Sequence, residues 1–157
     1  MARRRRAQKR EAATDPKYNS QLVGRIISIC MRRGKKSTAE SIAYGALDEI
    51  AQKSSGQDPL EVLVKAVDNV KPKVEVKSRR VGGATYQVPV EVSSDRQMAL
   101  ALRWIITFSS TRKGMSMGKA LAAEVLDAYK NQGNAVRKRD DMHKMAQANR
   151  AFAHYAW

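Results

Sequence analysis

Apolar residues recur at helical spacing along most of the chain, with polar residues between them. In the first such run, Val23, Ile26 and Cys30 follow one another at intervals of three and four, which places them on one face of a helix. Comparable runs follow, separated by loops that contain glycine, proline or charged residues. The pattern predicts six helices, which begin near residues 20, 37, 59, 94, 117 and 134.

Capping signals indicate where these helices begin and end. Asp58-Pro59 supplies an N-cap followed by a proline at the first helical position. Ser37-Thr38-Ala39-Glu40 and Ser94-Asp95-Arg96-Gln97 match the capping box, and Ser116 is expected to cap the fifth helix. Gly34 is expected to end the first helix as a C-terminal cap.

Between the third and fourth helices, the period changes to the two-residue alternation of β-strands. Val74–Lys77 and Tyr86–Val92 alternate apolar residues with polar residues or proline, and Gly82-Gly83 lies between them. The sequence therefore predicts a two-stranded ribbon with Arg79 and Arg80 near its tip.

The register of this ribbon depends on the length of its turn. A two-residue turn at Gly82-Gly83 would place Val76 opposite Pro89 and Val74 opposite Glu91, which mixes apolar and polar positions on one face. We therefore expect a loop of three or five residues, or a bulge.

Length and composition are consistent with one folded domain and a basic arm. The chain has 157 residues, of which 43% are hydrophobic, enough for a core of a domain this size. Residues 1–19 are rich in arginine and poor in apolar residues, so we expect a basic arm that is disordered until bound. Residues 20–157 are expected to form a single mainly α-helical, bundle-like domain, into which the ribbon, about 73–92, is inserted.

The single cysteine and the absence of long apolar stretches favour an unexported, cytoplasmic protein, with an organelle stroma or matrix as the alternative. Cys30 is the one cysteine, so no intramolecular disulfide can form, and its place on the first helix indicates a packing role. The arginine-rich start is not followed by the apolar core of a signal peptide.

Sequence patterns for catalysis are missing. The chain has no phosphate-binding glycine loop, no His-Glu-x-x-His and no nucleophile elbow. His143 and His154 are eleven residues apart, too far along a helix to share a metal ion. We therefore expect no enzyme, no cofactor and no metal site.

Charge indicates a polyanionic partner. Thirty Lys and Arg residues against fifteen Asp and Glu give a net charge of +15, and the cations cluster at the arm, at helix ends and on the ribbon. Such scattered clusters suit a folded RNA better than one recognition helix in DNA. An architectural DNA-binding protein and an RNA-modifying enzyme are the alternatives.

Four motifs resemble the family of small-subunit ribosomal protein seven: Gly34–Ser37, Ser78–Val92, Ala101–Ile106 and Ala148–Tyr155. The resemblance runs along the whole chain. It implies a helical protein with a ribbon between helices three and four, which binds the 3′ major domain of small-subunit rRNA and nucleates assembly of the subunit head. It also implies contacts of the ribbon with exit-site tRNA and mRNA, and contacts with neighbouring head proteins and a platform protein.

This resemblance and the charge clusters together nominate site residues. The rRNA-binding candidates are Arg3, Arg4, Arg5, Arg6, Lys9, Arg10, Arg32, Lys35, Lys36, Arg112, Lys113 and Lys119. The candidates for the ribbon tip, near tRNA and mRNA, are Arg79, Arg80, Val81, Gly82 and Gly83. The candidates for contacts of the C-terminal helix are Arg137, Lys138, Arg139, His143, Lys144 and Arg150.

The chain departs from the usual family pattern at two places. Ala156 stands where an arginine commonly precedes the terminal Trp157, which puts a C-terminal contact in doubt. Ser93-Ser94 stands where proline or basic residues are common, which affects only the capping of the fourth helix.

Overall fold

Six α-helices, a two-stranded ribbon and a short 3-10 helix follow one another in the computed structural model, which describes residues 13–54 and 56–155. The elements are α1 Gln21–Cys30, α2 Lys36–Lys53, α3 Pro59–Val70, β1 Val74–Val81, β2 Ala84–Glu91, α4 Ser94–Thr111, α5 Met117–Tyr129, α6 Asn134–Ala148 and the 3-10 helix η1 Arg150–Tyr155. The expected mainly α-helical class, with its ribbon between the third and fourth helices, is confirmed.

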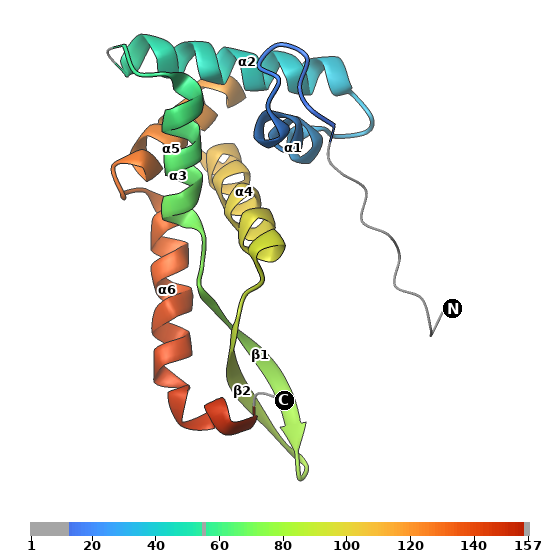
Figure 1. Ribbon diagram of the computed structural model, residues 1–157, viewed down its shortest axis with the longest axis vertical. Helices are drawn as coiled ribbons and strands as arrows, with labels where there is room; N and C mark the ends of the chain where they lie inside the picture. The colour runs from blue at the N-terminus through green and yellow to red at the C-terminus, as the bar shows by residue number, and fades with distance from the viewer. Residues whose placement is uncertain (1–12, 55, 156–157) are drawn as a thin grey trace.

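The helices form the body of the molecule, and the ribbon projects from one end of it. Helix α5 packs against α2, α3 and α4, and their buried aliphatic residues form one continuous core. Figure 1 shows α2 lying across the end of the body opposite the ribbon, while α6 extends down toward the two strands. No helix of the described residues is long and apolar enough to cross a membrane.

The described residues that precede α1 pack against the helices. Asp15 is buried and accepts hydrogen bonds from the Lys17 amide at 3.1 Å, the Tyr18 amide at 2.9 Å and the Tyr44 hydroxyl at 2.6 Å. The bond to Asp15 raises the pKa of Tyr44 to about 12. On α1, a Cβ at Gly24 would lie 2.5 Å from the Ala13 carbonyl oxygen, so only glycine permits this close approach. Residues 13–18 are therefore tied to α1 and α2.

Capping was predicted correctly at one helix and wrongly at others. The Asp58 carboxylate accepts from the Leu60 amide at 3.0 Å, with Pro59 at the first helical position, as expected. Helix α2 begins at Lys36, one residue before the expected capping box, and Ser116 makes no side-chain capping bond. Helix α4 begins at Ser94, one residue earlier than its box requires, and Gln97 donates to the Val92 carbonyl instead.

Helix α1 also ends earlier than expected. Its last residue is Cys30, so Gly34 lies in the connection to α2 and does not cap α1. The sequence pattern could not reveal this, because Arg33 joins Gly34 in the left-handed region with a φ of +53°, and the two together make the turn.

The expected odd-length hairpin loop is wrong. Val81 pairs with Ala84 across a two-residue turn at Gly82-Gly83, so Val76 lies opposite Pro89. Both glycines have positive φ, +57° and +90°, as a type I′ turn requires, and this turn matches the twist of the strands. Backbone geometry at the turn therefore sets the register.

Apolar and polar residues can share a face of the ribbon because both faces of its base are partly covered by the rest of the protein. Val88 is fully buried on one face, while Val76 is half-buried on the other. The face of Val88 also carries the buried carboxylate of Glu75, to which Arg96 donates at 2.7 Å. Burial alone would raise the pKa of Glu75, but the bonds from Arg96 and Lys77 outweigh it and lower this pKa.

The C-terminal segment braces the ribbon. The Tyr86 ring lies 5.2 Å from the ring of Phe152 and 5.4 Å from that of Tyr155, centroid to centroid. Helix α6 ends at Ala148, and the chain then turns into η1. That turn brings the aromatic rings of η1 against β2.

Candidate nucleic-acid interface

The connection between α1 and α2 carries a dense group of cations. Arg32, Arg33 and Lys35 are all exposed, and no carboxylate of the described residues forms an ion pair with any of them. Lys36 opens α2 and stays largely exposed, 3.7 Å from Glu40 one turn later. The tight turn at Arg33 and Gly34 thus presents several positive charges to solvent.

The connection between α4 and α5 contributes fewer cations than the sequence indicates. The Arg112 guanidinium donates to Glu124, through Nε at 2.9 Å, and to Asp127 at 2.6 Å. Glu124 is completely buried and also accepts from the Ala135 amide at 3.0 Å. Burial alone would lower the pKa of Arg112, but the bonds to Asp127 and Glu124 outweigh it and raise this pKa.

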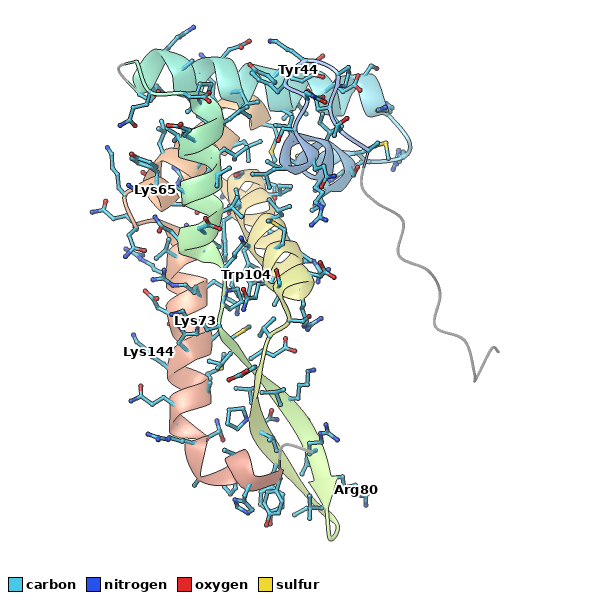
Figure 2. The ribbon with its side chains drawn as sticks, viewed as in Figure 1. Tyr44, Lys65, Lys73, Arg80, Trp104 and Lys144 are labelled. Carbon is cyan, nitrogen blue, oxygen red and sulfur yellow. The ribbon has the colours of Figure 1, made fainter. Side chains whose placement is uncertain are left out.

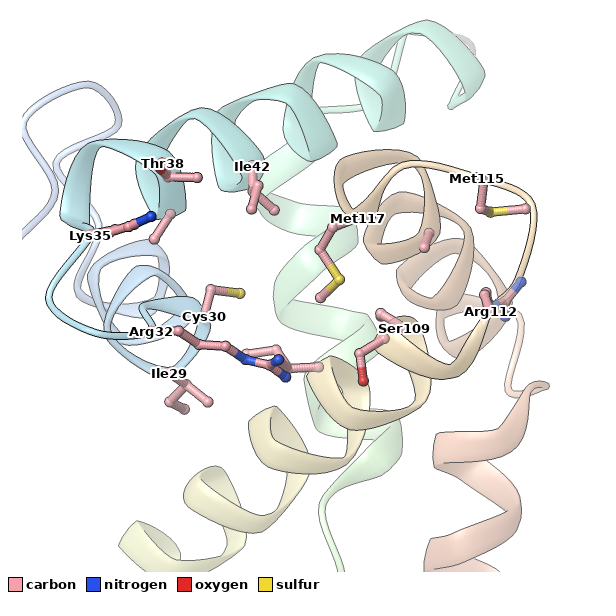
Figure 3. Close-up of a pocket in the computed structure, with 14 residues that line it drawn as sticks. Ile29, Cys30, Arg32, Lys35, Thr38, Ile42, Ser109, Arg112, Met115 and Met117 are labelled. Atoms are coloured by element: carbon pink, nitrogen blue, oxygen red, sulfur yellow. The ribbon is translucent and has the colours of Figure 1, made fainter.

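Arg112 therefore serves as an internal tie between α4, α5 and α6. Lys113 is exposed on the same connection, and Lys119 is exposed on the first turn of α5. The two connections meet in space, because Arg32, Lys35 and Arg112 line one cleft (Figure 3). Two sequence-distant basic segments are thus brought together at one end of the molecule.

The ribbon tip lies at the opposite end. In Figure 2, Arg80 is at the far end of the ribbon from Tyr44 on α2. Arg79 and Arg80 both belong to β1, and neighbouring strand residues point to opposite faces. Arg79 pairs with Tyr86 and shares its face, whereas Arg80 pairs with Thr85 and is exposed on the other.

The two arginines therefore lie on opposite faces of the ribbon. Val81 is half-buried and ends β1, and Gly82 and Gly83 form the exposed turn.

The cations of α6 divide into exposed and internally bonded residues. Arg137, Lys138 and Lys144 are exposed, and Figure 2 shows Lys144 on the side of α6 away from the ribbon. Arg150 is exposed at the start of η1. The Arg139 guanidinium instead donates to the Asn69 carbonyl, to Asn131 Oδ1 and to Asp140 Oδ1.

His143 also has a structural contact. Its Nε2 accepts the backbone N–H of Lys73 at 3.0 Å, just before β1. Desolvation, and then the nearby Arg139 charge, lower the pKa of His143. The neutral imidazole thereby joins α6 to the base of the ribbon.

Two features of this surface were not predicted. The aromatic contact of Tyr86 with Phe152 and Tyr155 has no local sequence signal, because its members come from separate elements. The cleft likewise depends on how four helices meet.

The expected candidates Arg3, Arg4, Arg5, Arg6, Lys9 and Arg10, and also Ala156, lie outside the described residues. Within the described part of the chain, no cluster of His, Cys, Asp and Glu fits a metal ion.

Comparisons with known proteins identify the family. The family model described as Ribosomal protein S7p/S5e matches residues 2–150. Similar proteins include the small ribosomal subunit protein uS7 of Anaeromyxobacter sp. strain Fw109-5, of Acidithiobacillus ferrooxidans and of Akkermansia muciniphila. Each is 57% identical over all 157 residues and over the full length of the relative. The chain therefore belongs to the family of Ribosomal protein S7p/S5e, as the motifs of its ribbon and C-terminal segment predicted.

Proposed function

We propose that this protein is a structural constituent of the small ribosomal subunit and binds small-subunit rRNA. Its family consists of structural, non-enzymatic ribosomal components, and the protein is not an enzyme. The relatives that the chain matches over their full length are named small ribosomal subunit protein uS7. A structural role makes no bond and breaks none, so binding is the whole of the mechanism.

The observation that carries this proposal is the convergence of the α1–α2 and α4–α5 connections on one surface. Arg32, Arg33, Lys35 and Lys113 are exposed there. Cations without internal carboxylate partners neutralise phosphates and release counterions, which is the main sequence-independent source of affinity for RNA. The expected basic arm, residues 1–19, adds Arg3, Arg4, Arg5, Arg6, Lys9 and Arg10 to the same function.

The finer assignment follows the family resemblance. The exposed cations of the two connections hold the 3′ major domain of the rRNA and nucleate assembly of the subunit head. The ribbon, with Arg80 exposed near its tip, reaches exit-site tRNA and the mRNA. The exposed cations of α6 and η1, namely Arg137, Lys138, Lys144 and Arg150, face neighbouring head proteins and a platform protein. The cytoplasmic ribosome is the proposed location.

Arg112 and Arg139 have a different role in this proposal. Their guanidinium groups are bonded to Glu124, Asp127 and Asp140, so they position the basic surface and do not bind phosphate. This division separates structural cations from binding cations among the residues nominated by sequence.

A competition titration tests the proposal. The purified protein is titrated with a folded 3′ major-domain rRNA fragment and with duplex DNA of equal length, at several salt concentrations. We expect a preference for the rRNA that persists as salt rises, because specific contacts survive screening. Equal affinity for both, with parallel loss in salt and self-association of the protein, would instead identify an architectural DNA-binding protein.

A further inference from the structure

A cleft of about 380 Å³ lies between α1, α2, α4 and α5. Its interior is apolar, because Cys30, Ile42, Ile106 and Met117 line it. Figure 3 shows Cys30 and Met117 pointing into the space between the helices. Its volume lies within the roughly 300–1,000 Å³ typical of sites that enclose small organic groups.

The mouth of the cleft is cationic. Arg32 and Lys35 line it, and neither forms an ion pair with a carboxylate of the described chain. In Figure 3, the Arg32 side chain extends from the α1–α2 connection toward Ser109 on α4. A planar guanidinium thus lies beside an apolar space.

Exposed apolar side chains flank the same opening. Ile29 is 39% exposed and Met115 is 46% exposed, and both contribute to the lining of the cleft. These two side chains extend the apolar lining of the cleft to its rim, where a bound group would cover them.

A nucleotide matches both the apolar interior and the cationic mouth of the cleft. An unstacked base has an apolar, polarisable face that packs against aliphatic side chains and on a guanidinium plane, while its phosphate needs a cation nearby. The thioether of Met117 adapts to such a ring and contacts its edge favourably. An apolar side chain from a protein would fill the interior but would leave the charges of Arg32 and Lys35 without a partner.

We propose that this cleft receives one unstacked nucleobase of the bound RNA, with Arg32 stacked on the base and Lys35 at the adjacent phosphate. The inference rests on the proposed rRNA-binding function. It adds a shape-selective contact to a surface that otherwise recognises RNA by charge.

The test uses two matched pairs of variants. Cys30→Phe fills the cleft, and Cys30→Ser keeps its volume. Arg32→Gln and Arg33→Gln each remove one charge from the same exposed turn, but only Arg32 lines the cleft. Each variant is first checked by thermal unfolding, and its affinity for the 3′ major-domain fragment is then measured. Chemical probing of the complex reports which unpaired bases are protected.

We expect the wild-type protein and Cys30→Ser to protect one unpaired base. Cys30→Phe should lose that protection and bind about 5- to 150-fold more weakly, the range for removal of one base-stacking interaction. Arg32→Gln should weaken binding more than Arg33→Gln and expose the same base.

Two results would overturn the inference, and they are distinguishable. If the wild-type protein binds the fragment and folded Cys30→Phe gives the same affinity and protection, the cleft holds no base. The cleft also holds no base if Cys30→Phe leaves affinity and protection unchanged but impairs incorporation of the protein into subunits. A protein side chain would then be the occupant of the cleft. If the wild-type protein does not bind the fragment, the proposed function itself fails.

Discussion

At the scale of single residues, the most consequential side chain is the buried carboxylate of Glu124. It accepts hydrogen bonds from Arg112 and from the Ala135 amide, and so joins the α4–α5 connection to the start of α6. Glu124→Gln removes the charge that compensates Arg112. We expect the free energy of unfolding in urea to fall by about 3–5 kcal/mol, the usual cost of breaking a buried ion pair, with an unchanged m-value.

Asp127→Asn is the matched control for this substitution. Asp127 bonds the same guanidinium at 2.6 Å, but its side chain is 43% exposed, so water can replace the missing bond. We expect a decrease below about 1 kcal/mol. Equal decreases for the two variants would mean that burial of Glu124 does not determine the strength of this network.

A second residue, His143, should make stability depend on pH. Its folded-state pKa lies below 6.5, so folding favours the neutral imidazole that accepts from the Lys73 amide. The unfolded chain therefore binds a proton first as pH falls. The stabilisation is complete above about pH 6.5 and is lost as pH drops through the lowered folded-state pKa.

Urea unfolding between pH 5 and 7.5 measures this effect, within the range where a histidine near its ordinary pKa of about 6.5 titrates. His143→Gln keeps an acceptor and removes the titration, so its stability should fall less than that of the wild-type protein over this interval. His154→Gln serves as the control, because His154 is exposed on η1. A wild-type pH dependence that persists in His143→Gln would locate the titrating group elsewhere.

At the scale of secondary-structure elements, the glycine turn governs the ribbon. Gly83 has a φ of +90°, and nothing lies within 4 Å of a Cβ placed there, so the cost of Gly83→Ala is backbone strain alone. A strained residue of this kind costs about 1–3 kcal/mol. We expect faster amide hydrogen exchange in β1 and β2 with little change in exchange of the helical core.

Gly82→Asn is the comparison for that prediction. Gly82 has a φ of +57°, in the left-handed region that asparagine tolerates. The ribbon amides of Gly82→Asn should exchange almost as slowly as those of the wild-type protein. Exchange as slow as in the wild-type protein in both variants would mean that side-chain contacts at the base hold the ribbon and that the turn is dispensable.

The elements also show where sequence patterns suffice and where they fail. Helix bodies were predictable, since apolar periodicity reflects the single core that α2–α5 share. The hairpin register was predicted wrongly. The prediction gave more weight to keeping apolar residues on one face than to the two-residue turn that Gly82 and Gly83 favour. The short serine-led capping patterns failed where neighbouring backbone geometry allowed α2 and α4 to begin earlier.

At the scale of the whole molecule, the proposed binding groups lie at two ends of one helical body. The α1–α2 and α4–α5 connections meet around the cleft, and the ribbon projects from the opposite end (Figure 1). Charge clusters in the sequence located both ends. Which cations are committed to internal bonds, as Arg112 and Arg139 are, required the positions of Glu124, Asn69 and Asp140 in space.

This separation predicts different effects of neutralising cations at the two ends. Lys35→Gln combined with Lys36→Gln removes two exposed charges beside the cleft, so rRNA affinity should fall and its dependence on salt should flatten. The logarithmic slope should decrease by about 0.7 to 0.9 for each phosphate that no longer binds a lysine. Arg80→Gln should leave that slope unchanged, because Arg80 lies at the far end of the molecule, near the ribbon tip.

The measurement is the affinity for the 3′ major-domain fragment across a series of salt concentrations, with thermal unfolding as the check on folding. Arg80→Gln should instead weaken retention of exit-site tRNA by reconstituted subunits, because an exposed guanidinium there is available to bind a second RNA. Equal flattening of the slope by Arg80→Gln and by the lysine pair would place the rRNA along the entire molecule. The two ends would then form one continuous binding surface and not two surfaces with separate partners.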